Sequence, residues 1–168
     1  VTIVEMFGIL GRDDPELAAV VAGRLRRDGI KVLENARVTS VSGVSSGGAL
    51  SVTVEREGHT VGLVGSHLLV AVGRRANTDG LGLEALNIAT EKNGTVTVDG
   101  FLRTRFPNIF ACGDVAGPYQ FTHVAAHQAW YASVNALFGR FKKFQVDYRV
   151  IPWATFTDPE VARVGLSE

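Results

Sequence analysis

Residues 1–33, VTIVEMFGILGRDDPELAAVVAGRLRRDGIKVL, contain the pattern that decides the fold class. Residues 1–4 are a β-branched run, and both this run and residues 31–33 predict strands. Between them, Asp14 is placed to cap a helix, a proline follows at the first helical position, and apolar residues recur at fourfold spacing, which predicts a helix over residues 15–28. Strand, helix and strand in this order imply parallel strands joined by a helical crossover. The sequence therefore predicts an α/β fold.

The rest of the chain consists of strand-like stretches and one long helix. From Arg37 to Val64 the hydrophobic period is two and glycines separate the stretches, which predicts an antiparallel meander. A short continuous apolar run further along predicts a strand that is buried on both faces. Thr122 is placed to cap the long helix. The expected elements are strands at 37–42, 49–56, 60–64, 67–72, 95–98, 108–112 and 148–156 and a helix at 122–138.

Composition and charge exclude several classes of protein. The 168 residues include 17 basic and 17 acidic side chains, so the net charge does not direct the chain to nucleic acid or to anionic lipid. A hydrophobic content of 46% excludes a disordered chain, and no apolar run reaches the length of about 18 residues that a membrane span needs. We therefore expect a cytoplasmic protein with no nucleic-acid or membrane partner. A single cysteine, Cys112, excludes an internal disulfide, a cysteine-built zinc site and a dithiol redox centre within this chain.

Glu5 is the first candidate binding residue, because it ends a strand that precedes a loop and a helix. A carboxylate in this place can accept hydrogen bonds from two vicinal ribose hydroxyls, and it repels a 2′-phosphate. A solvated acid at a strand end explains the position equally well, because the glycine-rich phosphate turn normally lies about 20 residues upstream of such an acid. The first strand also begins without a turn or a cap, so we expect the chain to start inside a sheet.

A second candidate is ACGDVAG at residues 111–117, directly after a strand-like stretch. Small residues such as Gly113 let the backbone approach a ligand closely. Asp114, at the carboxyl edge of a strand, can hold the hydroxyl groups of a sugar or a ribityl chain. An aspartate that accepts local backbone hydrogen bonds within a turn is the alternative explanation of this pattern.

A third candidate is QFTH at residues 120–123, where the long helix is predicted to start. Free N–H groups and the positive end of the helix suit a flavin whose N1–C2=O region gains negative charge on reduction. We assign His123 no acid or base role, because a single histidine near a helix start is more often structural than catalytic. His127, one turn later, is expected to be a packing residue.

Together these motifs resemble the pyridine nucleotide-disulfide oxidoreductases, flavoenzymes that include dihydrolipoamide dehydrogenase, glutathione reductase and mercuric reductase. The resemblance covers essentially the whole chain. Residues 1–5 are similar to the second strand of the family's NAD-binding domain, and LVAVGRRANT at residues 69–78 is similar to the crossover back to its FAD-binding domain. The family usually has proline where Ala76 stands, so this turn is expected to be less rigid here. FPNIFACGDVAG at residues 106–117 resembles the second FAD fingerprint with its lead-in, and residues 151–168 resemble the opening of the dimerisation domain.

The resemblance implies a partial two-dinucleotide-binding, Rossmann-like fold with an antiparallel β-meander. The implied domains are the C-terminal part of an NAD(P)-binding domain at 1–73, the C-terminal part of an FAD-binding domain at 74–147 and the start of a dimerisation domain at 148–168. Asp114 is implied to bind the ribityl chain of FAD. The other implied cofactor-binding residues are Gly113, Gln120, Phe121, Thr122 and His123 for the flavin and Glu5, Val38 and Gly73 for NAD.

The activity that the resemblance implies is electron transfer from NAD(P)H, with NADH favoured by Glu5, through FAD to a disulfide, a metal ion or a related acceptor. The partners it implies are a small-molecule or disulfide substrate and, in the complete enzyme, a second subunit of a homodimer. Residues 121–138 lean toward the mercuric-reductase-like branch of the family.

Several of the family's motifs do not occur in this sequence. They are the N-terminal FAD motif, the redox-active cysteine pair, the NAD phosphate turn and the C-terminal histidine-glutamate pair. We therefore expect no catalytic residue and no metal ligand in this chain, and we expect the isolated chain to be inactive. Cys112 is expected to be a buried structural thiol. The alternative interpretation is a non-catalytic nucleotide-binding remnant or a structural module.

Overall fold

The computed structural model describes residues 1–43 and 48–165, and the chain divides into two compact units. The first unit consists of Val1–Ala71 together with the segment that begins at Pro152, and the second unit is Val72–Ile151. Within the described residues, no helix is long and apolar enough to cross a membrane.

The first unit begins with the predicted strand, helix and strand. These elements are β1 (Thr2–Val4), α1 (Pro15–Arg27) and β2 (Lys31–Leu33). β1 and β2 pair in parallel, with Ile3 opposite Val32. The carboxylate of Asp14 accepts hydrogen bonds from the amides of Glu16 and Leu17, at 2.8 and 3.4 Å, so Asp14 caps α1 as predicted. A parallel pair joined by a helix confirms the α/β class.

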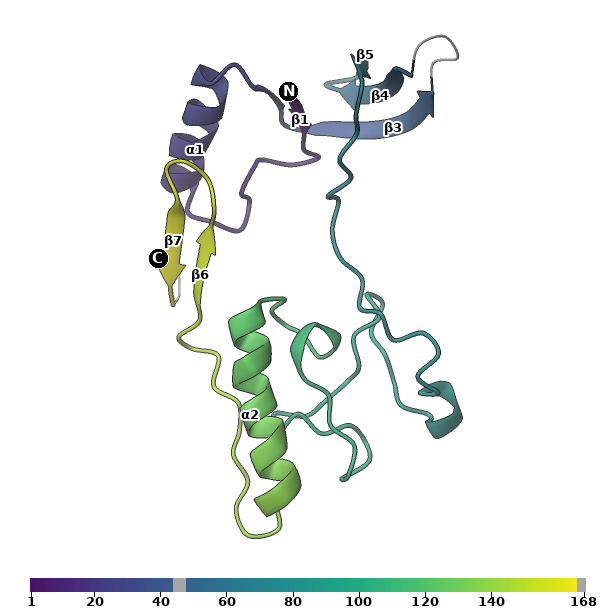
Figure 1. Ribbon diagram of the computed structural model, residues 1–168, viewed down its shortest axis with the longest axis vertical. Coiled ribbons are helices and arrows are strands. Elements are labelled where there is room, and N and C mark those ends of the chain that lie inside the picture. The colour runs from purple at the N-terminus through teal and green to yellow at the C-terminus, as the bar shows by residue number, and fades with distance from the viewer. Residues whose placement is uncertain (44–47, 166–168) are drawn as a thin grey trace. The chain divides into compact units, whose positions relative to one another are not determined.

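The predicted antiparallel meander follows in the same unit, and Figure 1 shows its first strand starting next to β1. Its strands are β3 (Ala36–Gly43), β4 (Leu50–Arg56) and β5 (His59–Gly65), in the order β3-β4-β5. A β-bulge between Val38 and Ser40 shifts the register of β3 against β4. The buried side chains of Leu33, Ala36 and Val54 form the core that joins β2 to the meander.

A short antiparallel hairpin completes the first unit. It consists of β6 (Pro152–Thr155) and β7 (Val161–Val164). The indole N–H of Trp153 donates to Asp13 Oδ1 at 2.9 Å, and the guanidinium carbon of Arg163 lies 3.5 Å from the centre of the Trp153 ring. These contacts attach the hairpin to the loop that precedes α1. The strand predicted at 148–156 is therefore too long, because only β6 within it finds a pairing partner among the described residues.

The second unit contains the long helix α2 (Thr122–Phe138), which confirms the helix predicted there. Two 3-10 helices, η1 (Glu84–Leu86) and η2 (Gly113–Val115), precede it. Its main core cluster consists of Leu102, Ala132 and Val146. The prediction that Thr122 caps α2 is wrong. The cap position is Phe121, and no side chain accepts a hydrogen bond from the first turn.

Three predicted strands do not form, at 67–72, 95–98 and 108–112. The first of these runs joins no ladder with another described residue, and the side chains of Leu69 and Val72 are 90% and 92% exposed. Each of the other two runs contributes a single isolated bridge. An apolar run becomes a strand only where a neighbouring strand takes up its backbone N–H and C=O groups. Among the described residues, no strand lies beside any of these runs, and the backbone groups of residues 95–98 and 108–112 bond to non-strand segments instead, as from Val96 to Val115 at 2.7 Å and from Ala111 to Leu102 at 3.1 Å.

Candidate functional site

The glycine-aspartate motif forms a tight turn that lies against α2. Gly113 has φ +77°, a conformation that residues with a Cβ rarely adopt, and a Cβ built on it would lie 3.3 Å from Cβ of Ala125. The carbonyl of Gly113 accepts hydrogen bonds from the amides of Ala116 and Gly117, at 2.9 and 3.2 Å. Glycine is therefore required at residue 113, both for the backbone conformation and for the close approach to the helix.

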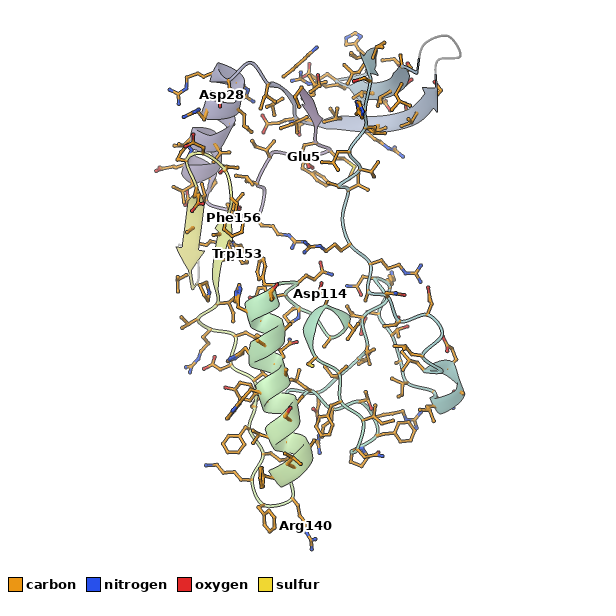
Figure 2. All side chains as sticks on the ribbon, in the orientation of Figure 1. Glu5, Asp28, Asp114, Arg140, Trp153 and Phe156 are labelled. Atoms are coloured by element: carbon orange, nitrogen blue, oxygen red, sulfur yellow. The ribbon has the colours of Figure 1, made fainter. Side chains whose placement is uncertain are left out.

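Asp114 follows on this turn and is exposed, and Figure 2 shows it beside the first turn of α2. Its carboxylate makes no hydrogen bond or ion pair with any other described residue. The turn is closed instead by backbone hydrogen bonds to Gly113. The alternative interpretation, in which the aspartate accepts local backbone hydrogen bonds, is therefore wrong. An exposed carboxylate of this kind can accept hydrogen bonds from the hydroxyl groups of a ligand.

The start of α2 lies directly after this turn. The amides of Thr122 and His123, which are both exposed, donate no hydrogen bond within residues 1–43 and 48–165. The first turn of the helix carries no acidic side chain that would neutralise its positive end. The guanidinium of Arg74 donates to the carbonyl of Gln120 at 3.1 Å and so holds the segment that leads into the helix. Together these groups provide a positive, hydrogen-bond-donating surface that suits an anionic or electron-rich ligand.

Aromatic rings extend along the same segment. The rings of Phe121 and His123 are stacked, with centroids 5.4 Å apart and an interplanar angle of 9°. The ring of Tyr119 stacks on Phe121 at 6.3 Å and also contacts Tyr148 at 5.9 Å. His127 is partly buried, and its Nε2 lies 3.1 Å from the carbonyl oxygen of Asp147. The ring of His127 also packs edge-on against Tyr131, which confirms the prediction that it packs.

Gln128 is a site residue that sequence reasoning missed. It is fully buried on α2, and its Oε1 accepts the amide N–H of Gly113 at 2.6 Å. Its Nε2 donates to the carbonyl of Gly117 at 2.6 Å and to the hydroxyl of Tyr148 at 2.7 Å. One signal in the sequence could have identified it: Gln128 is a polar residue at a position of α2 that faces the core. The buried residues of α2 are Val124, Gln128, Ala132 and Asn135. Burial raises the pKa of the Tyr148 phenol, so this hydroxyl stays protonated at neutral pH.

Glu5 lies at the end of β1 in the first unit and is labelled in Figure 2. One carboxylate oxygen, Oε1, accepts the amide of Phe7 at 3.1 Å, and the other has no partner among the described residues. Glu34 contacts the loop that follows Glu5. It accepts the amide of Ile9 at 3.0 Å and pairs with Arg26 at 2.7 Å. The carboxylate of Glu5 therefore keeps one oxygen without a partner among the described residues.

Two further residues are expected to contact NAD. Val38 lies in β3, with 44% of its surface exposed, and Gly73 has φ +130° with open space where a Cβ would be. Glu5 and Val38 belong to the first unit, whereas Gly73 and the turn that carries Asp114 belong to the second. Cys112 is only partly buried and packs against the core of the second unit, so the expectation of a buried thiol is met in part. Among the described residues, no cluster of histidine, cysteine and acidic side chains could hold a metal ion.

Comparison with known proteins extends this picture. A family model described as pyridine nucleotide-disulphide oxidoreductase matches residues 1–129. Dihydrolipoyl dehydrogenase of Geobacillus stearothermophilus is 38% identical over 100% of this chain and 35% of its own length. Mercuric reductase of Streptomyces lividans is 36% identical over 100% of this chain and 35% of its own length. The chain thus spans about a third of the length of these curated relatives.

Solved structures agree with the sequence comparison. LpdA of Mycobacterium tuberculosis is 34% identical and aligns with a TM-score of 0.85 over 99% of this chain and 35% of its own. The Cu(II) complex of the HOCl-induced flavoprotein disulfide reductase RclA of Escherichia coli is 33% identical. It aligns with a TM-score of 0.82 over 100% of this chain and 38% of its own.

Proposed function

Because the chain belongs to the pyridine nucleotide-disulphide oxidoreductase family, we propose that it forms part of a flavoenzyme. This enzyme passes electrons from NAD(P)H through FAD to a disulfide, a metal ion or a related acceptor. FAD, when bound, supplies the electron-transfer chemistry, and the residues of this chain bind and orient it. The exposed carboxylate of Asp114, on a turn held in place by α2, is the observation that carries the proposal.

The turn suits the ribityl chain of FAD, and the start of α2 suits the pyrimidine end of its flavin ring. Asp114 accepts hydrogen bonds from the hydroxyl groups of the ribityl chain. The free amides of Thr122 and His123, at the positive end of α2, favour negative charge at the pyrimidine end of the flavin. Gln120 and Phe121 complete the lining of this end. Gly113 lets the backbone of the turn approach both α2 and the cofactor.

Glu5 and Val38 of the first unit are proposed to bind the pyridine nucleotide, and Gly73 is proposed as a further residue that contacts NAD. The free oxygen of Glu5 accepts a hydrogen bond from a ribose hydroxyl, and its charge repels the 2′-phosphate of NADPH, so NADH is the favoured donor. The proposed domains are those implied by the family, at residues 1–73, 74–147 and 148–168. The complete enzyme is proposed to be a homodimer in the cytoplasm, where NADH is available.

The direct test uses the complete polypeptide that contains these residues. We expect the purified protein to be yellow, to keep its flavin through gel filtration and to be bleached by NADH under anaerobic conditions. Oxidised lipoamide, glutathione disulfide and Hg²⁺, added one at a time, then identify the acceptor as the compound that restores the oxidised flavin spectrum. A colourless protein that does not react with NADH would support the non-catalytic alternative instead.

The preference for NADH is tested by Glu5→Gln in the same protein. Loss of the charge removes the repulsion of a 2′-phosphate, so the ratio of kcat/KM for NADH to that for NADPH should fall about tenfold. Glu55→Gln is the matched control, because Glu55 is an exposed glutamate on β4 of the same unit. A complete enzyme that already prefers NADPH, or a ratio that the two variants lower equally, would contradict the role of Glu5.

A further inference from the structure

We propose that Gln128 is a positioning residue that holds the Asp114 turn in the conformation that binds FAD. The inference rests on the proposed function and deepens it. Gln128 is not among the residues expected to touch the cofactor. It acts through the backbone at both ends of the turn, because it accepts the amide of Gly113 and donates to the carbonyl of Gly117, each at 2.6 Å.

One side chain thus bridges the two ends of the turn, in addition to the backbone hydrogen bond from the Gly117 amide to the Gly113 carbonyl at 3.2 Å. Asp114 lies between the two glycines that Gln128 bridges, so the position of its carboxylate depends on the separation of Gly113 from Gly117. Both glycines have positive φ, +77° and +63°, and glycine can adopt several backbone conformations, so the single 3.2 Å backbone hydrogen bond between them leaves room for a side chain to define the turn further. The buried amide of Gln128 selects one of these conformations. We therefore expect Gln128 to determine the position of the Asp114 carboxylate relative to the ribityl hydroxyls.

The chemistry of the site explains why an amide is needed. The amide of Gly113 needs an acceptor, whereas the carbonyl of Gly117 needs a donor, and a primary amide offers both. The hydroxyl of Tyr148 accepts the second N–H of Gln128 at 2.7 Å, while the Gly113 N–H and the Gly117 carbonyl fix which way the amide faces. A leucine in this place would leave the buried amide of Gly113 and the carbonyl of Gly117 without partners. An ionised carboxylate would accept from Gly113 but would repel the carbonyl of Gly117.

Asn135 supplies a matched control on the same helix. Asn135 is also buried, with 6% exposed, and its side chain also makes three hydrogen bonds, all of them to backbone atoms. Its partners are Phe101 and Phe144, which lie outside the proposed flavin site. Asn135→Leu therefore measures what the loss of a buried amide does to folding alone.

The experiment compares wild type, Gln128→Leu, Gln128→Glu and Asn135→Leu in the complete holoenzyme. Flavin fluorescence released on dilution gives the dissociation constant of FAD, and visible circular dichroism reports the asymmetry around the bound flavin. We expect Gln128→Leu to raise the dissociation constant at least about tenfold and to change the circular dichroism. Asn135→Leu should change the dissociation constant by less than about threefold, although both variants lower the melting temperature.

Gln128→Glu gives a second, pH-dependent test that does not require the leucine variant to fold. A protonated carboxyl can accept from Gly113 and donate to Gly117, so this variant should bind FAD almost as wild type does at low pH. Its affinity should fall as the pH rises and the buried carboxyl ionises. Tyr148 is the titratable side chain among its hydrogen-bond partners, and its phenol stays neutral over this range.

The outcomes separate the two proposals. A wild-type protein without flavin refutes the proposed function, and the role of Gln128 with it. A flavin-loaded wild type leaves the function standing. The role of Gln128 is then overturned if both Asn135→Leu and Gln128→Leu weaken FAD binding equally. It is also overturned if the FAD affinity of Gln128→Glu follows that of wild type at every pH.

Discussion

At the scale of single residues, two aspartates of the second unit differ in whether the fold uses the carboxylate. Asp99 accepts the amides of Phe101 and Arg103 and pairs with the Arg103 guanidinium at 2.7 Å. Burial alone would raise the pKa of Asp99, but these hydrogen bonds outweigh it, and the pKa is lowered. Asp114 makes none of these contacts among the described residues. The carboxylate of Asp114 therefore makes no contact with a described residue that would stabilise the fold.

Asp114→Ala should for that reason weaken FAD binding without destabilising the protein. Loss of hydrogen bonds to a charged acceptor should raise the dissociation constant of FAD about tenfold or more. The free energy of unfolding of the FAD-free protein should change by less than about 0.5 kcal/mol. Asp99→Ala is the control, and it should lower that free energy by about 1 kcal/mol while leaving the FAD affinity unchanged. Urea unfolding and flavin release measure the two quantities. Equal loss of FAD in both variants would contradict the distinction.

A second residue-scale prediction concerns Asp147, which follows α2. Hydrogen bonds from Arg149 lower its pKa from 3.8 to about 2. Because the folded-state pKa lies below the ordinary value, the interaction is complete above pH 3.8 and is lost as the pH falls through about 2. Carboxyl-carbon NMR should show Asp147 titrating near 2, and Arg149→Gln should return its pKa toward 3.8. An unchanged titration in that variant would show that another group lowers the pKa.

At the scale of elements, α1 is the helix whose limits were most readable from sequence. The N-cap aspartate, the proline after it and the glycine past the end of the helix are local signals, and each acts within one turn of the chain. Asp14→Ala should lower the free energy of unfolding of the first unit by about 1 kcal/mol. Asp14→Ser keeps a capping oxygen and should recover most of that loss. Urea unfolding followed by the fluorescence of Trp153, in a Trp130→Phe background, is a suitable readout, and equal effects of alanine and serine would exclude a capping role.

The elements that sequence did not predict correctly depend on distant partners. The meander was predicted correctly, because each of its strands pairs with a neighbour in sequence. The strand-like runs at 67–72, 95–98 and 108–112 have no strand beside them among the described residues, and local composition does not reveal whether a partner strand is present. For the site, the small residues of the turn were readable as a motif. The bonds of Gln128 were not, because they join a helix to backbone atoms of Gly113 and Gly117 that only the fold brings near.

At the scale of the whole molecule, the exposed apolar run at 67–72 is unexplained by the residues around it. Leu69, Val70 and Val72 are 90%, 67% and 92% exposed, an arrangement that is costly for side chains of this kind. The chain spans about a third of the length of its curated relatives. We therefore expect that, in the complete protein, this run is a strand of a larger sheet.

Hydrogen exchange tests this expectation on two samples, the isolated chain and the complete protein. Amides in β4 pair with strands on both sides and should be protected in both samples, which makes them the internal control. Amides of residues 67–72 should exchange rapidly in the isolated chain and at least about a hundredfold more slowly in the complete protein, because a paired strand opens only by local unfolding. Rapid exchange of residues 67–72 in the complete protein, with β4 still protected, would show that the run is a linker in the finished fold.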